Sequence, residues 1–207
     1  MISAVEALKR LQEGNRRFVD GVRHIEAPAS PEKRKDLLAG QAPFAVILAC
    51  SDSRVPVEHI FDQGFGDLFV IRVAGNIVTP SLAGSAEYAV QQLGTRLLVV
   101  LGHTRCGAVG ATLESLRQPG GKLSENIASI VDRIRPAVED LLKTEPECDP
   151  DALLRQAVRA NVRRSVDALR QDSEILRQLM DRDGLRIVGA EYSLESGEVD
   201  FFDDAPA

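Results

Sequence analysis

The chain has 207 residues, 44% of them hydrophobic, which is enough for a globular protein with a sizeable core. Its 31 acidic residues outnumber the 25 basic ones and give a net charge of -6, which argues against a nucleic-acid or anionic membrane partner. No apolar run is long enough to span a membrane and no secretory signal is visible, so we expect a cytoplasmic protein.

The first predicted element is an amphipathic helix that begins at Ser3. Glu6 follows Ser3 by three residues, which is the spacing of a capping box. The apolar positions of this helix are Val5, Leu8 and Leu11. The helix ends within residues 14–21, and we interpret residues 1–40 as an N-terminal helical arm.

Strands and helices then alternate along residues 41–207. Four apolar runs have the length of strands buried on both faces, at residues 44–50, 68–73, 97–101 and 185–189. Helical stretches lie between them, at residues 57–61, 81–93, 108–116, 124–142 and 151–169. This alternation predicts an α/β fold with a mostly parallel β-sheet flanked by helices.

The end of the chain carries a turn signal. Ser196 and Gly197 stand between Tyr192 and the run at 199–202, which predicts an antiparallel hairpin at the sheet edge. The loops rich in proline and glycine, at residues 119–121 and 145–150, are too short to separate domains. We therefore expect a single domain over residues 1–207.

The residues that carry chemistry follow two of the predicted strands. Cys50 ends the first apolar run, and His103 and Cys106 come directly after the third. The carboxyl ends of parallel strands meet at one edge of an open sheet, where ligands bind. Two thiols and one imidazole are a zinc-ligand set that leaves a fourth position open for water. An odd count of three cysteines also favours metal or catalytic use over a disulfide framework.

Each of these residues also has an ordinary structural explanation. A cysteine at a strand end packs as a small hydrophobe, and Asp52 with Arg54 forms a local ion pair. Together, these explanations require several coincidences at one sheet edge, so we favour the metal site. Three other residues lack a ligand spacing and are interpreted as surface or structural groups: Cys148, His24 and His59.

With Cys-Ser-Asp-Ser-Arg at residues 50–54 and His-Thr-Arg-Cys at residues 103–106, the chain resembles the β-class carbonic anhydrases over nearly its whole length. The matching segments are residues 11–18 (Leu-Gln-Glu-Gly-Asn-Arg-Arg-Phe), 40–43, 69–76, 87–90 and 102–107 (Gly-His-Thr-Arg-Cys-Gly). The resemblance implies Zn²⁺ held by Cys50, His103 and Cys106. It also implies reversible hydration of carbon dioxide to bicarbonate and a proton, by attack of a zinc-bound hydroxide.

Asp52 and Arg54 are the expected catalytic pair beside this metal. Asp52 is placed to orient the hydroxide, and Arg54 to keep Asp52 ionised. Related enzymes also use the aspartate as a fourth zinc ligand in a closed state. The sequence is compatible with both the closed state and the state in which water is the fourth ligand. No histidine is plainly placed as a proton shuttle. Cobalt or cadmium would satisfy the same ligands.

The resemblance also assigns four substrate-binding residues. Gln41 matches a position that donates an amide to the substrate in the plant-like branch of the family, while Phe69 and Tyr88 match residues that line a narrow apolar pocket. Ordinary structural roles explain these residues equally well: Gln41 as a polar residue of a loop, and Phe69 and Tyr88 as part of the core. Gly107 has no side chain in front of its N–H, so it is placed to donate to an oxyanion or to cap the following helix.

Regulation by bicarbonate is not expected. The bicarbonate-regulated branch carries a tryptophan three residues before the first zinc cysteine, whereas this chain has Ile47 there. Arg72 is retained, but the regulatory anion pocket is then incomplete. The plant-like branch is therefore favoured, without cooperative inhibition by bicarbonate.

A homodimer or a dimer of dimers is the assembly that the resemblance implies. The N-terminal helix has no obvious place in one α/β layer, and in the family such a segment packs onto a neighbouring subunit. The equivalents of Gln41, Phe69 and Tyr88 approach the zinc from the partner chain.

Two other classes of function remain open. A hydrolase of carbonyl sulfide or carbon disulfide would use the same zinc site on molecules of the same linear shape. A zinc-storage or redox-sensing protein would also use the two thiols, but it would not need Asp52 and Arg54. A nucleotide-binding domain is rejected because no glycine-rich phosphate loop follows the first predicted strand.

Overall fold

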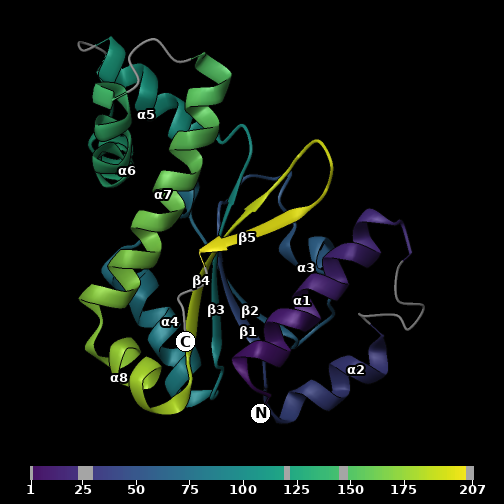
Figure 1. The fold of residues 1–207 in the computed structure, drawn as a ribbon. Coiled ribbons are helices and arrows are strands. Elements are labelled where there is room, and N and C mark those ends of the chain that lie inside the picture. The colour runs from purple at the N-terminus through teal and green to yellow at the C-terminus, as the bar shows by residue number, and fades with distance from the viewer. Residues whose placement is uncertain (1, 23–29, 119–121, 145–148, 204–207) are drawn as a thin grey trace.

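The computed structural model describes residues 2–22, 30–118, 122–144 and 149–203, which form a five-stranded sheet with helices on both faces (Figure 1). The strands are β1 (Ala45–Ala49), β2 (Leu68–Arg72), β3 (Leu97–His103), β4 (Arg186–Tyr192) and β5 (Val199–Asp203). Their order in the sheet is β2-β1-β3-β4-β5. The first four strands are parallel and β5 is antiparallel to β4, so the predicted mostly parallel sheet and its edge hairpin are confirmed.

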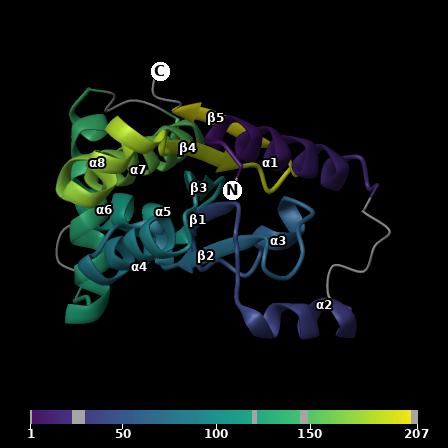
Figure 2. The same ribbon diagram turned by 90° about the horizontal axis from the view of Figure 1, so that it is seen from below.

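The helices form two layers, which separate clearly when the molecule is seen from below (Figure 2). One face of the sheet packs against α1 (Ala4–Val19) and α3 (Val57–Ile60). The other face packs against α4 (Pro80–Gln92), α7 (Pro150–Asp172) and α8 (Glu174–Asp183). A third cluster joins α7 to α5 (Gly107–Arg117) and α6 (Glu125–Thr144). None of the helices within the described ranges is long and apolar enough to cross a bilayer.

Two helices were not predicted. α2 (Pro31–Asp36) has no buried residue, and α8 buries only Leu176 fully. α2 therefore lacks the repeated apolar positions from which a helix is recognised in a sequence, whereas α8 carries them only in one short stretch, at residues 175, 176, 179 and 180. The 3-10 turns η1 (Leu37–Ala39) and η2 (Ala74–Asn76) were also missed, and η2 lies beside the functional site described below.

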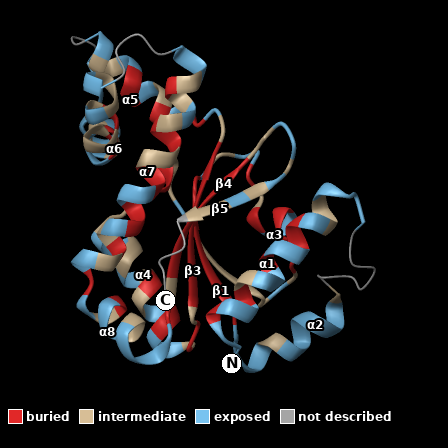
Figure 3. Cartoon of the chain, in the orientation of Figure 1, coloured by how far each residue is buried: buried red, intermediate tan, exposed pale blue. Residues whose placement is uncertain are grey.

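The burial of the strands follows their place in the sheet (Figure 3). β1 and β3 are buried along their whole length, as predicted. The same expectation is wrong for β2, in which Leu68 to Val70 are half-buried and Arg72 is exposed. β2 is an edge strand, so one side of it has no neighbouring strand in this chain.

The N-terminal helix packs on its own sheet. The Glu6 N–H donates to Ser3 Oγ at 3.2 Å, which confirms the predicted cap. Ala4, Ala7 and Leu11 are buried in the same core as β1 and β3, whereas Val5 is 58% exposed. The helix therefore has a place in one α/β layer, contrary to expectation, and Val5 does not belong to its buried face.

Asn15 joins three elements that are distant in sequence. Its Nδ2 donates to the carbonyl oxygens of Ile60 (3.2 Å) and Gly197 (2.9 Å), and its Oδ1 accepts from the N–H of Val199 at 2.9 Å. The Asn15 side chain is 6% exposed, and its bond to Ile60 is buried, so the Ile60 carbonyl depends on it in place of water. Asn15 thereby fixes α1 against α3 and the hairpin between β4 and β5.

We expect Asn15→Ala to lower the free energy of unfolding by about 2 to 3 kcal/mol, because it removes three hydrogen bonds and leaves the buried Ile60 carbonyl without this donor. Urea denaturation at fixed protein concentration measures the change. Gln12→Ala, at an exposed position of the same helix, is the matched control and should stay close to wild type. Equal stability of the two variants would show that Asn15 does not hold these elements.

Candidate metal centre

The three predicted ligand residues meet at the carboxyl edge of the sheet. Cys50 directly follows β1, His103 is the last residue of β3, and Cys106 is the N-cap of α5. The chain runs from β1 to β2 on one side and then to β3 on the other, which is the switch point where open α/β sheets bind ligands. The ligand atoms of the three residues lie within 4.8 Å of one another, and all three residues are buried.

The hydrogen bonding of His103 leaves one ring nitrogen for a metal. Nδ1 lies 2.9 Å from the carbonyl oxygen of Thr104, and because a carbonyl only accepts, Nδ1 carries the hydrogen. Nε2 is buried and finds no hydrogen-bond partner among the described residues. Nε2 is thus an unpaired acceptor beside two sulfur atoms, and the hydrogen bond at Nδ1 fixes the orientation of the ring. This arrangement is typical of a histidine that binds a metal.

The two thiols share a hydrogen bond. The hydrogen bond with Cys106 lowers the pKa of Cys50, and the same contact, together with burial, raises the pKa of Cys106. A divalent cation that binds both sulfurs as thiolates must displace any proton that they carry. Two thiolates and a neutral imidazole fit a soft metal with tetrahedral preference, such as zinc.

Asp52 and Arg54 form a two-pronged ion pair beside these ligands. Arg54 donates from Nε to Oδ1 at 2.9 Å and from Nη2 to Oδ2 at 2.8 Å, and the Arg54 N–H also donates to Oδ1. These bonds hold the pKa of Asp52 well below its usual range. Asp52 Oδ2 lies 3.7 Å from His103 Nε2, so the carboxylate borders the ligand set while it is paired with Arg54.

Arg72 and Glu195 support the ligand loops, and the sequence analysis did not find this role. Arg72 donates from Nε to the carbonyl of Cys50 at 3.1 Å and from Nη2 to that of Asp52 at 2.7 Å. Glu195 accepts from Thr104 Oγ1 at 2.8 Å and pairs with Arg105 at 2.7 Å. No motif marks these partners, because each contact joins residues that are far apart in sequence.

Three of the proposed substrate residues lie away from this edge. Gln41 is exposed four residues before β1, so the length of β1, about 16 Å at 3.3 Å per residue, separates it from Cys50. The rings of Phe69, early in β2, and of Tyr88, on α4, lie 6.3 Å apart, and Tyr88 is 50% exposed. Within one chain, these side chains are not brought to the ligand set.

Gly107 does lie at the site. It is the first residue of α5, directly after Cys106, and a Cβ built there would meet no atom within 4 Å. Its N–H, as that of the first residue of the helix, has no acceptor within α5. Of the residues interpreted as surface or structural groups, His59 is exposed on α3, whereas Cys148 and His24 lie outside the described residues.

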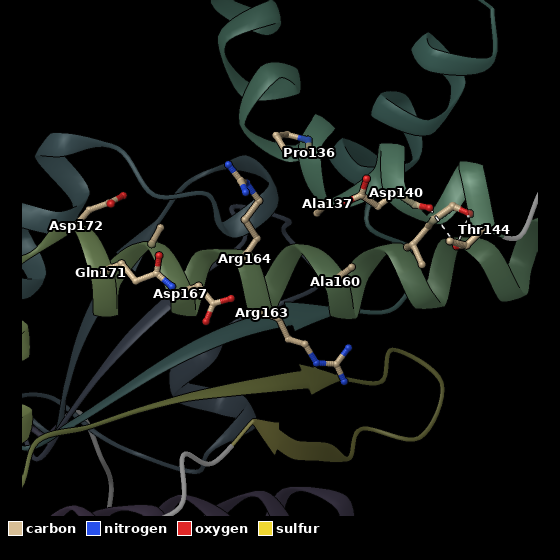
Figure 4. Close-up of a pocket in the computed structure, with 12 residues that line it drawn as sticks. Pro136, Ala137, Asp140, Thr144, Ala160, Arg163, Arg164, Asp167, Gln171 and Asp172 are labelled. Carbon is tan, nitrogen blue, oxygen red and sulfur yellow. Dashed lines mark hydrogen bonds between the residues drawn. The ribbon is translucent and has the colours of Figure 1, made fainter.

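A separate groove of about 580 Å³ lies between α6 and α7 (Figure 4). Arg164 of α7 extends towards Pro136 of α6, whereas Arg163 points to the other side, where its guanidinium lies 5.0 Å from the centroid of the Phe202 ring in β5. The described residues that line it include no cysteine and no histidine. The groove thus lacks the metal-ligand chemistry of the sheet edge.

Comparison with known proteins gives a consistent result. The carbonic anhydrase family profile matches residues 45–199. The chain is 41% identical over 198 residues to carbonic anhydrase 2 of Mycobacterium tuberculosis, covering 93% of this chain and 90% of that protein. It is 38% identical over 196 residues to the carbonic anhydrase of Mycolicibacterium smegmatis, covering 95% and 92%.

Solved structures show the same fold. The β-carbonic anhydrase CafA of Aspergillus fumigatus matches with a TM-score of 0.76 at 27% identity, covering 98% of this chain and 92% of that chain. The Coccomyxa β-carbonic anhydrase in complex with acetazolamide matches with a TM-score of 0.75 at 25% identity, covering 94% and 86%.

We expect the purified protein to bind about one zinc ion per chain, and Cys106→Ser to lose most of it, because a hydroxyl is a poor substitute for a thiolate ligand. Equilibrium dialysis followed by elemental analysis measures the content. Cys148→Ser is the control and should bind zinc like wild type. Full zinc occupancy in Cys106→Ser would exclude Cys106 as a ligand.

Proposed function

The chain belongs to the β-class carbonic anhydrases, and on this basis we propose that it catalyses the reversible hydration of carbon dioxide to bicarbonate and a proton, with Zn²⁺ as its cofactor. The observation that carries the mechanism is the buried group of Cys50, His103 and Cys106 with an ionised Asp52 at its border. A zinc-storage protein would not need this carboxylate.

Zn²⁺ held by these residues supplies a Lewis acid that makes water acidic enough to ionise in the physiological pH range. Asp52, which Arg54 keeps ionised, has only acceptor oxygens. It therefore accepts a hydrogen bond from the attacking oxygen and leaves the lone pair of that oxygen directed at the substrate carbon. The Gly107 N–H is placed to donate to the negative charge that develops on the substrate oxygen.

The remaining substrate contacts come from a second subunit in this proposal. Gln41, Phe69 and Tyr88 lie far from the ligands of their own chain but are exposed or half-buried. Their positions support a homodimer or a dimer of dimers in which each chain completes the site of its partner. In this proposal the protein acts in the cytoplasm, because an odd count of three cysteines favours metal or catalytic use over a disulfide framework.

We expect the zinc-loaded protein to hydrate carbon dioxide, with a rate that rises between about pH 6 and 9, because two thiolates leave the metal a weaker Lewis acid than three imidazoles. Asp52 stays ionised throughout this range because its pKa is depressed, so its protonation does not shape the profile. Stopped-flow measurement with a pH indicator gives the rates.

Two results would count against this proposal. One is a rate profile that stays flat down to about pH 6, because it would contradict the expected effect of the thiolate ligands. The other is turnover of carbonyl sulfide or carbon disulfide without turnover of carbon dioxide, which would assign the chain to the sulfur-substrate hydrolases.

We expect Asp52→Asn to lower kcat by about 100-fold while zinc content stays unchanged, since the amide keeps the shape of the side chain but not its charge. Asp132→Asn is the matched control. Asp132 also pairs with an arginine, Arg135 at 3.1 Å, but on the exposed surface of α6. A similar kcat for both variants would remove Asp52 from the mechanism.

A further inference from the structure

The turn η2 brings a backbone amide to one of the ligand sulfurs. The N–H of Gly75 donates to Cys50 Sγ at 3.3 Å, and this bond is buried. A hydrogen bond to a thiolate draws electron density from the sulfur, so the strength of Cys50 as a metal ligand depends on where this amide lies.

The backbone of this turn is unusual. Gly75 has φ +72° and the next residue, Asn76, has φ +43°, so two successive residues are left-handed. Only glycine fits at the first position, because a Cβ there would lie 2.8 Å from Ile134 Cδ1 and 3.2 Å from Ala108 Cβ. Left-handed conformations at residues other than glycine persist only where the surroundings enforce them.

Two side chains of α7 supply this enforcement. Asn161 Nδ2 donates to the carbonyl oxygen of Gly75 at 2.7 Å, and Ser165 Oγ donates to that of Asn76 at 2.9 Å. The two residues are one helical turn apart, so both side chains face the same way. They are 1% and 4% exposed, which leaves the carbonyl groups no alternative partner in bulk water.

We propose that Asn161 is a positioning residue that acts with Ser165 to hold the turn, so that the Gly75 amide stays on the Cys50 sulfur and moderates its donation to the metal. Neither residue belongs to the ligand set. This inference rests on the proposed function, since it assigns the amide a part in setting the Lewis acidity of a bound metal. Without Asn161, the amide moves from the sulfur and Cys50 becomes a stronger donor.

Three variants distinguish a positioning role of Asn161 and Ser165 from a general effect on core packing. Asn161→Leu keeps the approximate volume but removes the donor to Gly75, and Ser165→Ala removes the donor to Asn76. Val166→Ala is the control, because Val166 is buried on the same helix but packs in the cluster that faces β3 and β4. It should lower stability without disturbing the turn.

The cobalt-substituted proteins provide a readout that does not depend on turnover. The near-ultraviolet band for charge transfer from thiolate to cobalt should move to longer wavelength in Asn161→Leu, since loss of the N–H bond raises the energy of the sulfur lone pair. We expect a smaller shift in Ser165→Ala and none in Val166→Ala. If Asn161→Leu does not fold, the cobalt bands of Ser165→Ala and Val166→Ala decide whether the α7 donors position the turn.

Kinetics of the zinc enzymes give the second readout. We expect kcat of Asn161→Leu to fall by about 10-fold with KM unchanged, because the ligand is altered but the substrate contacts are not. An unmoved cobalt band in both α7 donor variants, or the same shift in Val166→Ala, would overturn the inference. A wild-type protein without carbon dioxide hydration would instead overturn the proposed function, while the cobalt band would still test the role of Asn161.

Discussion

The parallel pairing of β1 with β3 is the constraint on which the functional site depends. Ala49 pairs with Leu101 in the sheet, so Cys50 leaves β1 beside the last residues of β3, where His103 lies. Both strands are fully buried, and a shift of one residue would exchange the side chains that pack against the two helical layers. The packing of the hydrophobic core, and not the ligand residues, therefore sets the distance between Cys50 and His103.

Hydrogen bonds from distant elements hold the loops around this pair of strands. Arg72 binds the loop after β1, Glu195 binds the loop after β3, and Asn161 binds the turn after β2. Each such bond contributes about 1 kcal/mol to stability, which is modest. Their larger effect is on geometry, because they keep left-handed residues such as Arg105 and Asn76 in place around the ligand set.

The charges of the site balance in pairs. The two thiolates offset a bound divalent cation, and Arg54 offsets Asp52, whose side chain is 17% exposed. A partly buried carboxylate without a partner would be driven towards its protonated form, whereas the two-pronged pair keeps it ionised. The ion pair therefore supplies an oriented acceptor without adding net charge to the site.

Local sequence patterns were sufficient to predict the features of this protein that depend only on residues close together in the chain. The apolar runs that become β1 and β3, the cap at Ser3, and the motif residues at the strand ends are all local patterns. Only the tertiary structure showed that β2 is a half-buried edge strand, that α1 covers its own sheet, and that Arg72 and Asn161 support the ligand loops. These features arise from contacts between residues 20 or more positions apart, which no local pattern records.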